Sequence, residues 1–292
     1  MKAIQTTGLT KYYGKTRGID GLDLSVEQGD FFGFIGPNGA GKSTTIHILL
    51  GLISPTQGEG YVLGKNIKER TAILRRTGYL PSEAVLYRNM KAKDVLALSA
   101  AMRGMDCTSQ AKALCERLAL DPSRRIDELS FGNRKKVAII CALQSNPSLL
   151  ILDEPTGGLD PLMQREFFTI LRERNCQGTT VFLSSHVLSE IQRNCTRAAI
   201  IREGRLIACD SVSALSKTNA RRVTFHGSAA LGGLSGIRDK TEANGTTSFL
   251  YSGAVEPLLK ALAAGEIDEL TISEPDLEEV FLHYYEKDGE DA

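Results

Sequence analysis

One stretch, GPNGAGKST at residues 36–44, constrains this chain more than any other. It stands between the apolar run FFGFI and the periodic stretch TTIHILLGLI, an order typical of a buried strand, a glycine-rich turn and a helix. Gly36, Gly41, Lys42 and Ser43 satisfy G-x-x-x-x-G-K-[ST], which a chain of 292 residues matches by chance on the order of one time in a hundred. Glycines let the backbone fold around phosphates, and the helix N-terminus adds positive potential. The stretch therefore predicts a site for a nucleoside triphosphate.

The residues of this turn have separate expected roles. The Lys42 ammonium is expected to reach the β- and γ-phosphates, and the Ser43 hydroxyl is expected to ligate Mg²⁺. The alternative, a glycine turn with an idle lysine, leaves the flanking strand and helix unexplained. The predicted nucleotide-binding residues are Gly36, Pro37, Asn38, Gly39, Ala40, Gly41, Lys42, Ser43 and Thr44.

A second apolar run, LLILDEP, follows more than a hundred residues later. A carboxylate just past a buried strand is where a protein with such a turn holds Mg²⁺, and Asp153 has that place. Glu154 is the candidate general base, because hydrolysis needs an acceptor within hydrogen-bond reach of the attacking water. Taken alone, an Asp-Glu pair at a strand end is typical of a solvated loop. Together with the glycine-rich turn, the functional interpretation is favoured.

The order of the remaining patterns predicts an α/β fold. FFGFI, SLLILD and TTVFLS indicate buried parallel strands, and the helical stretch PLMQREFFTILRERN separates the last two. LDLSV, at residues 22–26, alternates with period two and predicts one antiparallel strand. Residues of about 82–145 predict a helical insertion, and the Glu203-Gly204 pair predicts a hairpin. We expect a P-loop NTPase core with an antiparallel β subdomain over residues 1–216.

The pattern of apolar and polar residues in the sequence changes after residue 216. RRVTFHG, TTSFLYSG and EIDELTIS predict strands of a small α+β domain over residues 217–292, and this domain carries no recognisable chemistry. A helix with Val255, Leu258, Leu259 and Leu262 on one face is expected between the last two. Another helix is expected to carry Leu277, Val280, Phe281 and Tyr284.

Composition limits the partners that the chain can have. Its 35 basic residues balance its 35 acidic residues, so it offers no overall field for nucleic acid. Its apolar runs are far shorter than the roughly 20 residues that cross a bilayer, and the first ten residues lack a signal-peptide core. The six cysteines are scattered without metal-binding spacing, so we expect them to be reduced. A cytosolic location follows from these expectations.

The motifs, in their order across residues 1 to about 213, resemble those of the ATP-binding subunits of ABC transporters. ELSFGNRKKVAIICAL resembles the signature of that family. The resemblance implies that Ser130 and Gly132 reach the γ-phosphate bound by the opposite subunit, which suits a helix N-terminus aimed at an anion. Standing alone, SFG would be an ordinary helix cap. Phe131 and Asn133 depart from the commoner Gly and Gln of the family.

The same resemblance assigns three further residues. GGLD resembles the loop that touches the partner's site through Asp160. His186, in LSSHV, is implied to be the switch histidine on the γ-phosphate, although a lone histidine at a strand end is commonly a packing residue. Tyr13 matches the aromatic residue that stacks on adenine, and Tyr12 is the competing candidate.

One motif of the family is altered in this chain. The family has Gln where GYLPSEAVLY places Ser82, a side chain about two carbons shorter. That Gln contacts Mg²⁺ and links the nucleotide to the membrane partner. Either Ser82 contacts Mg²⁺ through a water molecule, or Glu83 makes the contact in place of the Gln, or the contact is absent. The run Arg134-Lys135-Lys136 could add positive potential near the phosphates, but a solvated helix face is the favoured interpretation.

The resemblance implies a motor subunit that binds ATP and Mg²⁺. Two copies, or this chain and a related one, would enclose two ATP molecules and drive a separate permease, with the chain peripheral on the cytoplasmic face of the membrane. The ending EPDLEEVFLHYYE resembles the bacterial exporter branch. A non-transport ATPase of the same superfamily is the main alternative, but the chain has one cassette, no heptad run and no net charge. A P-loop kinase would leave the signature and the switch histidine unexplained.

Overall fold

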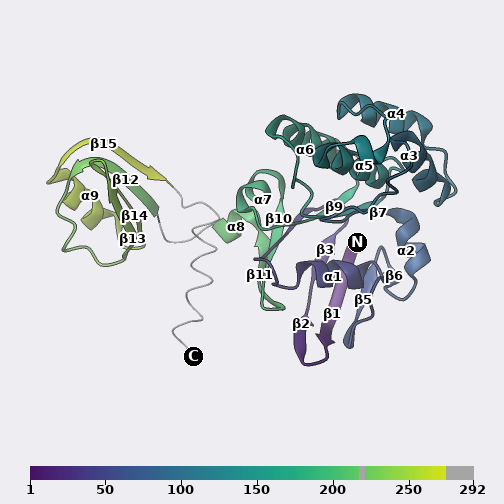
Figure 1. Cartoon of the computed structure of the whole chain (residues 1–292). Helices are drawn as coiled ribbons and strands as arrows, with labels where there is room; N and C mark the ends of the chain where they lie inside the picture. Colours follow the sequence, from purple (N-terminus) through teal and green to yellow (C-terminus); the bar gives the residue numbers. More distant parts are fainter. Residues whose placement is uncertain (217–220, 274–292) are drawn as a thin grey trace. The chain divides into compact units, whose positions relative to one another are not determined.

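The computed structural model describes residues 1–216 and 221–273 (Figure 1). The chain divides into two compact units, Met1–Asp210 and Ser211–Ala292. The last helix expected from the sequence, with Leu277 and Tyr284, lies outside the described residues.

The first unit is built on a six-stranded sheet. β4 (Phe31–Ile35) is buried along its whole length and pairs in parallel with β9 and β10. This confirms the prediction of a central parallel strand for FFGFI. The sheet has the order β11 (Arg205–Ser211), β10 (Arg197–Arg202), β4, β9 (Thr180–Ser185), β8 (Leu149–Asp153) and β7 (Thr77–Leu80).

Helices pack closely on one face of this sheet because two of its strands carry glycine there. A Cβ atom added at Gly33 would lie 2.5 Å from Ile191, which is in α7 (Leu188–Asn194). A Cβ atom at Gly78 would collide with the Ala142 carbonyl oxygen in α5 (Phe131–Leu143). α6 (Pro161–Cys176) packs against β9. Its first turn has the expected signals, since Asp160 caps it and Pro161 begins it.

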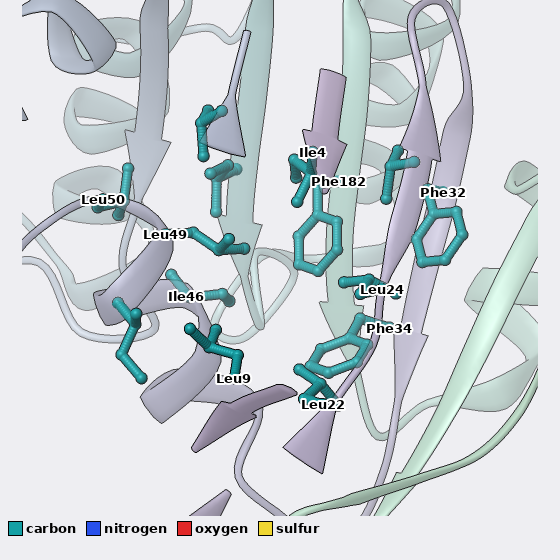
Figure 2. Packing of buried hydrophobic residues seen from close by; sticks show 14 of the residues in the cluster. Ile4, Leu9, Leu22, Leu24, Phe32, Phe34, Ile46, Leu49, Leu50 and Phe182 are labelled. Carbon is teal, nitrogen blue, oxygen red and sulfur yellow. The ribbon is translucent and has the colours of Figure 1, made fainter. Parts of the chain in front are cut away.

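The other face of the sheet is covered by α1 (Lys42–Leu49) and a five-stranded antiparallel sheet. Phe32, Phe34 and Phe182 project from the parallel strands into this core (Figure 2). Each buried side chain of this size stabilises the fold by roughly 1.5–3 kcal/mol. The antiparallel sheet contains β1 (Lys2–Tyr13), β2 (Thr16–Leu22), β3 (Ser25–Glu27), β5 (Gln57–Val62) and β6 (Lys65–Asn66).

The single strand predicted for residues 22–26 is wrong, because the chain is interrupted at residues 23–24. β2 and β3 both pair with β1, and local polar contacts hold the interruption. The Thr6 hydroxyl donates to the Leu22 carbonyl and accepts from the Leu24 amide, while the Asp23 carboxylate accepts from the Gly8 amide. The expected alternation of burial holds, because Leu22, Leu24 and Val26 are all buried.

The helical insertion lies between β7 and β8, as expected. It contains α3 (Ala92–Ala101), α4 (Thr108–Arg117), a 3₁₀ turn (Ile126–Glu128) and α5. Figure 1 shows α3, α4 and α5 grouped on one side of the parallel sheet. Arg117 ties this group to the core through ion pairs with Glu166 and Glu173 of α6. Arg103 adds hydrogen bonds to the carbonyls of Leu74 and Thr77, at the junction of α2 (Arg70–Arg76) and β7.

The described part of the second unit has a four-stranded sheet of order β13-β14-β12-β15. Its core contains Phe225 and Phe249 from the sheet, and Leu258 and Leu262 from α9 (Val255–Ala263). The other two apolar positions predicted for this helix face, Val255 and Leu259, are exposed. The unit begins with α8 (Val212–Ser216), and its strands are β12 (Arg221–Ser228), β13 (Ile237–Ala243), β14 (Thr246–Tyr251) and β15 (Glu266–Ser273).

Within residues 1–216 and 221–273, no helix has the length and apolar character needed to cross a membrane.

The two units have separate apolar cores, which leads to a prediction about truncation. A chain that ends at Ser216 should unfold in one cooperative transition and bind ATP as the full chain does, because the apolar core of the first unit is formed by its own residues. Thermal unfolding followed by circular dichroism, and titration with a fluorescent ATP analogue, measure both properties. Loss of either property would show that the second unit is required for the first to fold.

Candidate nucleotide-binding site

The glycine-rich turn joins the end of β4 to the start of α1. Gly41 has φ +106°, and a Cβ atom there would lie 2.6 Å from the Gly18 carbonyl oxygen. A Cβ atom at Gly36 would lie 2.5 Å from the Ile201 carbonyl oxygen. Side chains at these positions would push the loop away from its neighbours. Pro37, Asn38 and Gly39 form the exposed part of the turn, whereas Ala40 is buried.

Lys42 lies beneath the turn with only 6% of its surface exposed. Its Nζ donates to the carbonyl oxygens of Gly36 at 2.6 Å and Pro37 at 3.2 Å. Glu154 Oε1 lies 3.2 Å from the same ammonium, a charge contact without hydrogen-bond geometry. The turn and a carboxylate therefore hold the ammonium where phosphates would be received.

Asp153 is 1% exposed and is held by two hydroxyl groups. Ser43 Oγ donates to its Oδ2 at 2.8 Å, and Ser184 Oγ donates to its Oδ1 at 2.5 Å. Asp153 and Ser184 are paired neighbours at the carboxyl ends of β8 and β9. Burial, and secondarily the Asp153 charge, raise the pKa of nearby Tyr79 to about 12. Hydroxyl and carboxylate oxygens are the donors that Mg²⁺ prefers, so Ser43 and Asp153 fit this ion.

Ser184 was not predicted from the sequence as a residue of this site. Its only sequence signal is a hydroxyl side chain directly after the apolar run VFL, a position where a buried, unpaired polar group is costly.

Glu154 lies between two basic groups. His186 Nδ1 is 2.7 Å from Glu154 Oε2, whereas Lys42 contacts the other carboxylate oxygen, Oε1. The backbone of Glu154 has φ +47°, in the left-handed region. The His186 side chain is 55% exposed and the Glu154 side chain 22%, whereas Asp153 is buried. A carboxylate held in this way can accept a proton from a water molecule.

The structure places Tyr13 near the turn. A Cβ atom added at Gly18 would lie 3.0 Å from the Tyr13 ring and 3.2 Å from the Thr44 methyl group, so both side chains border the same glycine. The ring is 50% exposed, and Lys11 Nζ lies 5.3 Å from its centre. The competing candidate, Tyr12, donates its amide to Thr56 Oγ1. The proximity to Thr44 favours Tyr13 as the base-stacking residue.

The signature residues lie at the N-terminus of α5. Ser130 caps the helix by accepting from the Asn133 amide at 3.3 Å. A Cβ atom at Gly132 would lie 2.7 Å from the Gly158 carbonyl oxygen, and one at Gly158 would collide with the Phe131 ring. The signature therefore packs directly on the loop that leads to Asp160. Asp160 in turn accepts from the amides at the start of α6.

The solvated helix face expected for Arg134-Lys135-Lys136 is wrong. Lys135 and Lys136 are 3% and 8% exposed, because β7, α3 and α4 pack around α5. Lys135 Nζ donates to the Ser82 carbonyl at 2.8 Å, while the Ser82 residue itself is exposed. The structure therefore brings the main chain of Ser82 close to the site.

Comparisons with known proteins identify the family of the chain. The family description "ABC transporter" matches residues 19–157. The chain is 39% identical to the bacitracin transport ATP-binding protein BcrA of Bacillus licheniformis, over 76% of this chain and 74% of that protein. It is 33% identical to the Nod factor export ATP-binding protein I of Paraburkholderia xenovorans, over 99% of each.

Solved structures agree with the fold as well. The ATP-binding subunit of an ABC transporter superimposes with a TM-score of 0.69 and 29% identity, over 73% of this chain and 91% of that one. A dimeric bacterial ABC transporter cassette superimposes with a TM-score of 0.66 and 25% identity, over 72% and 98%. The predicted P-loop NTPase fold is thereby confirmed.

The fold and the comparisons together define a P-loop ATPase of the cassette type. The chain belongs to the ABC transporter family, as one of its nucleotide-binding, ATP-hydrolysing subunits.

The position of Lys42 yields a prediction about affinity. Lys42→Ala removes a charge-assisted contact of about 1.5–3 kcal/mol, so ATP should bind roughly ten- to a hundredfold more weakly. Titration with a fluorescent ATP analogue measures the change, and exposed Lys68→Ala is the matched control. Tight binding by the Lys42→Ala protein would contradict the assigned role.

Proposed function

We propose that this chain is the motor subunit of an exporter, in which two ATP-binding subunits close around two Mg-ATP molecules and drive a separate integral membrane permease. One observation carries the proposal: the end of β4 and the ends of β8 and β9 bring Lys42, Asp153 and Glu154 to one site. The printed names of the relatives, bacitracin transport and Nod factor export, support an export role. Attachment to the permease would place the chain on the cytoplasmic face of the membrane.

The residues of the site have complementary roles in hydrolysis. Lys42 and the amides of the turn bind and orient the phosphates. Glu154 accepts the proton of the attacking water, and His186 holds the Glu154 carboxylate by donating from Nδ1. Ser43 and Asp153 would hold Mg²⁺, which neutralises charge on the phosphates when bound. Ser184 keeps the Asp153 carboxylate in place.

The second subunit would complete each site. The dimeric structure of a related cassette supports this arrangement. Ser130 and Gly132, at the N-terminus of α5, would reach the γ-phosphate on the partner, and Asp160 would lie at the same interface. The partner is a second copy of this chain or a related subunit. This chain has no general affinity for nucleic acid, because its basic and acidic residues balance.

The role of Glu154 as the base yields a test. Glu154→Gln should bind ATP yet hydrolyse it at least about a hundredfold more slowly, because the amide cannot take up the proton. ATP-bound dimers should then accumulate in gel filtration with Mg-ATP. Undiminished turnover, together with a monomer profile that ATP does not change, would refute both the base and the dimer.

The altered position at Ser82 yields a second test, based on Mg²⁺ titration of the ATPase rate. Ser43→Ala should reduce activity severely, because it removes a predicted ligand, whereas Ser82→Ala should change it only slightly if water takes that place. A water held by the Ser82 hydroxyl would make the loss about 1 kcal/mol, nearly tenfold in rate. Glu83→Gln shows whether that carboxylate supplies the contact. Equally severe losses for Ser43→Ala and Ser82→Ala would make Ser82 a direct ligand.

A further inference from the structure

Lys135 is a buried cation that the mechanism above does not use. It lies in the early part of α5, and 3% of its surface is exposed. Its Nζ donates to the carbonyl oxygens of Ser82 at 2.8 Å, Pro81 at 3.2 Å and Glu154 at 3.3 Å. An ammonium has three N–H donors, so these carbonyls satisfy it completely. Two segments that are distant in sequence, residues 81–82 and Glu154, are therefore joined by one side chain.

Hydrogen bonds and neighbouring carboxylates oppose the cost of burying the Lys135 charge. Burial lowers the pKa of Lys135 and outweighs the carboxylates of Asp153, Glu154 and Glu83, which raise it. A buried ammonium is costly unless it is fully hydrogen-bonded, and here both its hydrogen bonds and its neighbouring charges favour the protonated side chain.

The backbone of Glu154 needs external support. Its φ of +47° lies in the left-handed region, which residues other than glycine keep only where their surroundings hold them. Its amide donates to the Ser184 carbonyl at 3.1 Å, and its carbonyl accepts from Lys135. The rotamers that a side chain can adopt depend on the backbone conformation of its residue. These two bonds therefore determine where the Glu154 carboxylate can meet Lys42 and His186.

We propose that Lys135 is a positioning residue, which fixes the main chain of Glu154 and couples it to the segment that follows β7. This inference rests on the proposed function, in which Glu154 is the base. The coupling runs through the carbonyl of Ser82, so it does not depend on the side chain at that position. A displacement of residues 81–82 would act on Glu154 through the shared ammonium.

Steady-state kinetics of the full chain tests this proposal. Lys135→Met keeps the length of the side chain but removes its donors, and it should lower kcat about ten- to a hundredfold, because small displacements of a base have effects of that size. KM for ATP should stay within about threefold, since Lys135 does not reach the phosphates. Lys135→Arg, which keeps the charge, should recover part of kcat.

Lys136→Met is the matched control. Lys136 is also a buried lysine of α5, and in the described part of the chain no hydrogen bond joins it to residues 81, 82 or 154. The kcat of Lys136→Met should stay within about twofold of that of the unaltered chain, because this variant loses no hydrogen bond to residues 81, 82 or 154. An equal loss of kcat in both variants would overturn the proposal in favour of a general effect on the helix.

A double-mutant cycle separates positioning from a structural role. If Lys135 acts through the Glu154 carboxylate, Lys135→Met should cause no further loss when added to Glu154→Gln, as single-turnover hydrolysis can show. The same fold loss in both backgrounds, or a kcat of Lys135→Met within twofold of normal, would overturn the inference. If the methionine variant does not fold, Lys135→Gln is measured against the same criteria.

The cycle also distinguishes this inference from the function on which it rests. Normal hydrolysis by the Glu154→Gln protein would refute the base itself. An inactive Glu154→Gln protein beside a fully active Lys135→Met protein would leave the base in place and refute only the role of Lys135.

Discussion

The site depends on the parallel pairing of β4, β9 and β8. In this register Ile35 lies beside Ser185, and Asp153 lies beside Ser184. Because parallel strands end at the same edge of a sheet, the turn after β4 meets the carboxylates at the end of β8. The strands are buried on both faces, so a shift of one residue would exchange the side chains of the two faces and disrupt both layers. Apolar packing thus sets the positions of the polar groups.

Contacts within the protein hold the polar groups of the site in place. Lys42 is held by the carbonyls of its own turn, and Asp153 is held by two serine hydroxyls. Glu154 contacts Lys42 and His186 through its two carboxylate oxygens. Groups that are fixed in this way need little rearrangement when charge develops on a bound phosphate. The conformational cost of this arrangement is concentrated at Glu154, because its backbone is left-handed. Glu154 is also the residue with the most demanding chemical role.

The parts of this structure that were predicted from sequence are those with a local signal. FFGFI has no polar side chain and LLILD is apolar up to its last residue, Asp153, as is typical of strands covered on both faces, and the glycine-rich turn carries its function within nine residues. The burial of Lys135 had no such signal, because a run of basic residues on a helix normally faces water. Its burial follows from packing by elements up to about 60 residues away in sequence. β13 was missed for a related reason, since six of its seven residues are exposed and its pattern carries no apolar alternation.

Two positions that depart from the expected motifs contact residues from other segments of the chain. Phe131 stands at a signature position where the commoner residue is Gly, and its ring occupies the space that any Cβ atom at Gly158 would need. Gly158 also has φ +82°, so both its conformation and its contact with Phe131 require glycine. Ser82 has a side chain about two carbons shorter than the Gln of the family, and its carbonyl is bound by Lys135. Gly158 accommodates the change at Phe131, whereas the Lys135 contact at Ser82 is made to the main chain and is independent of the side chain.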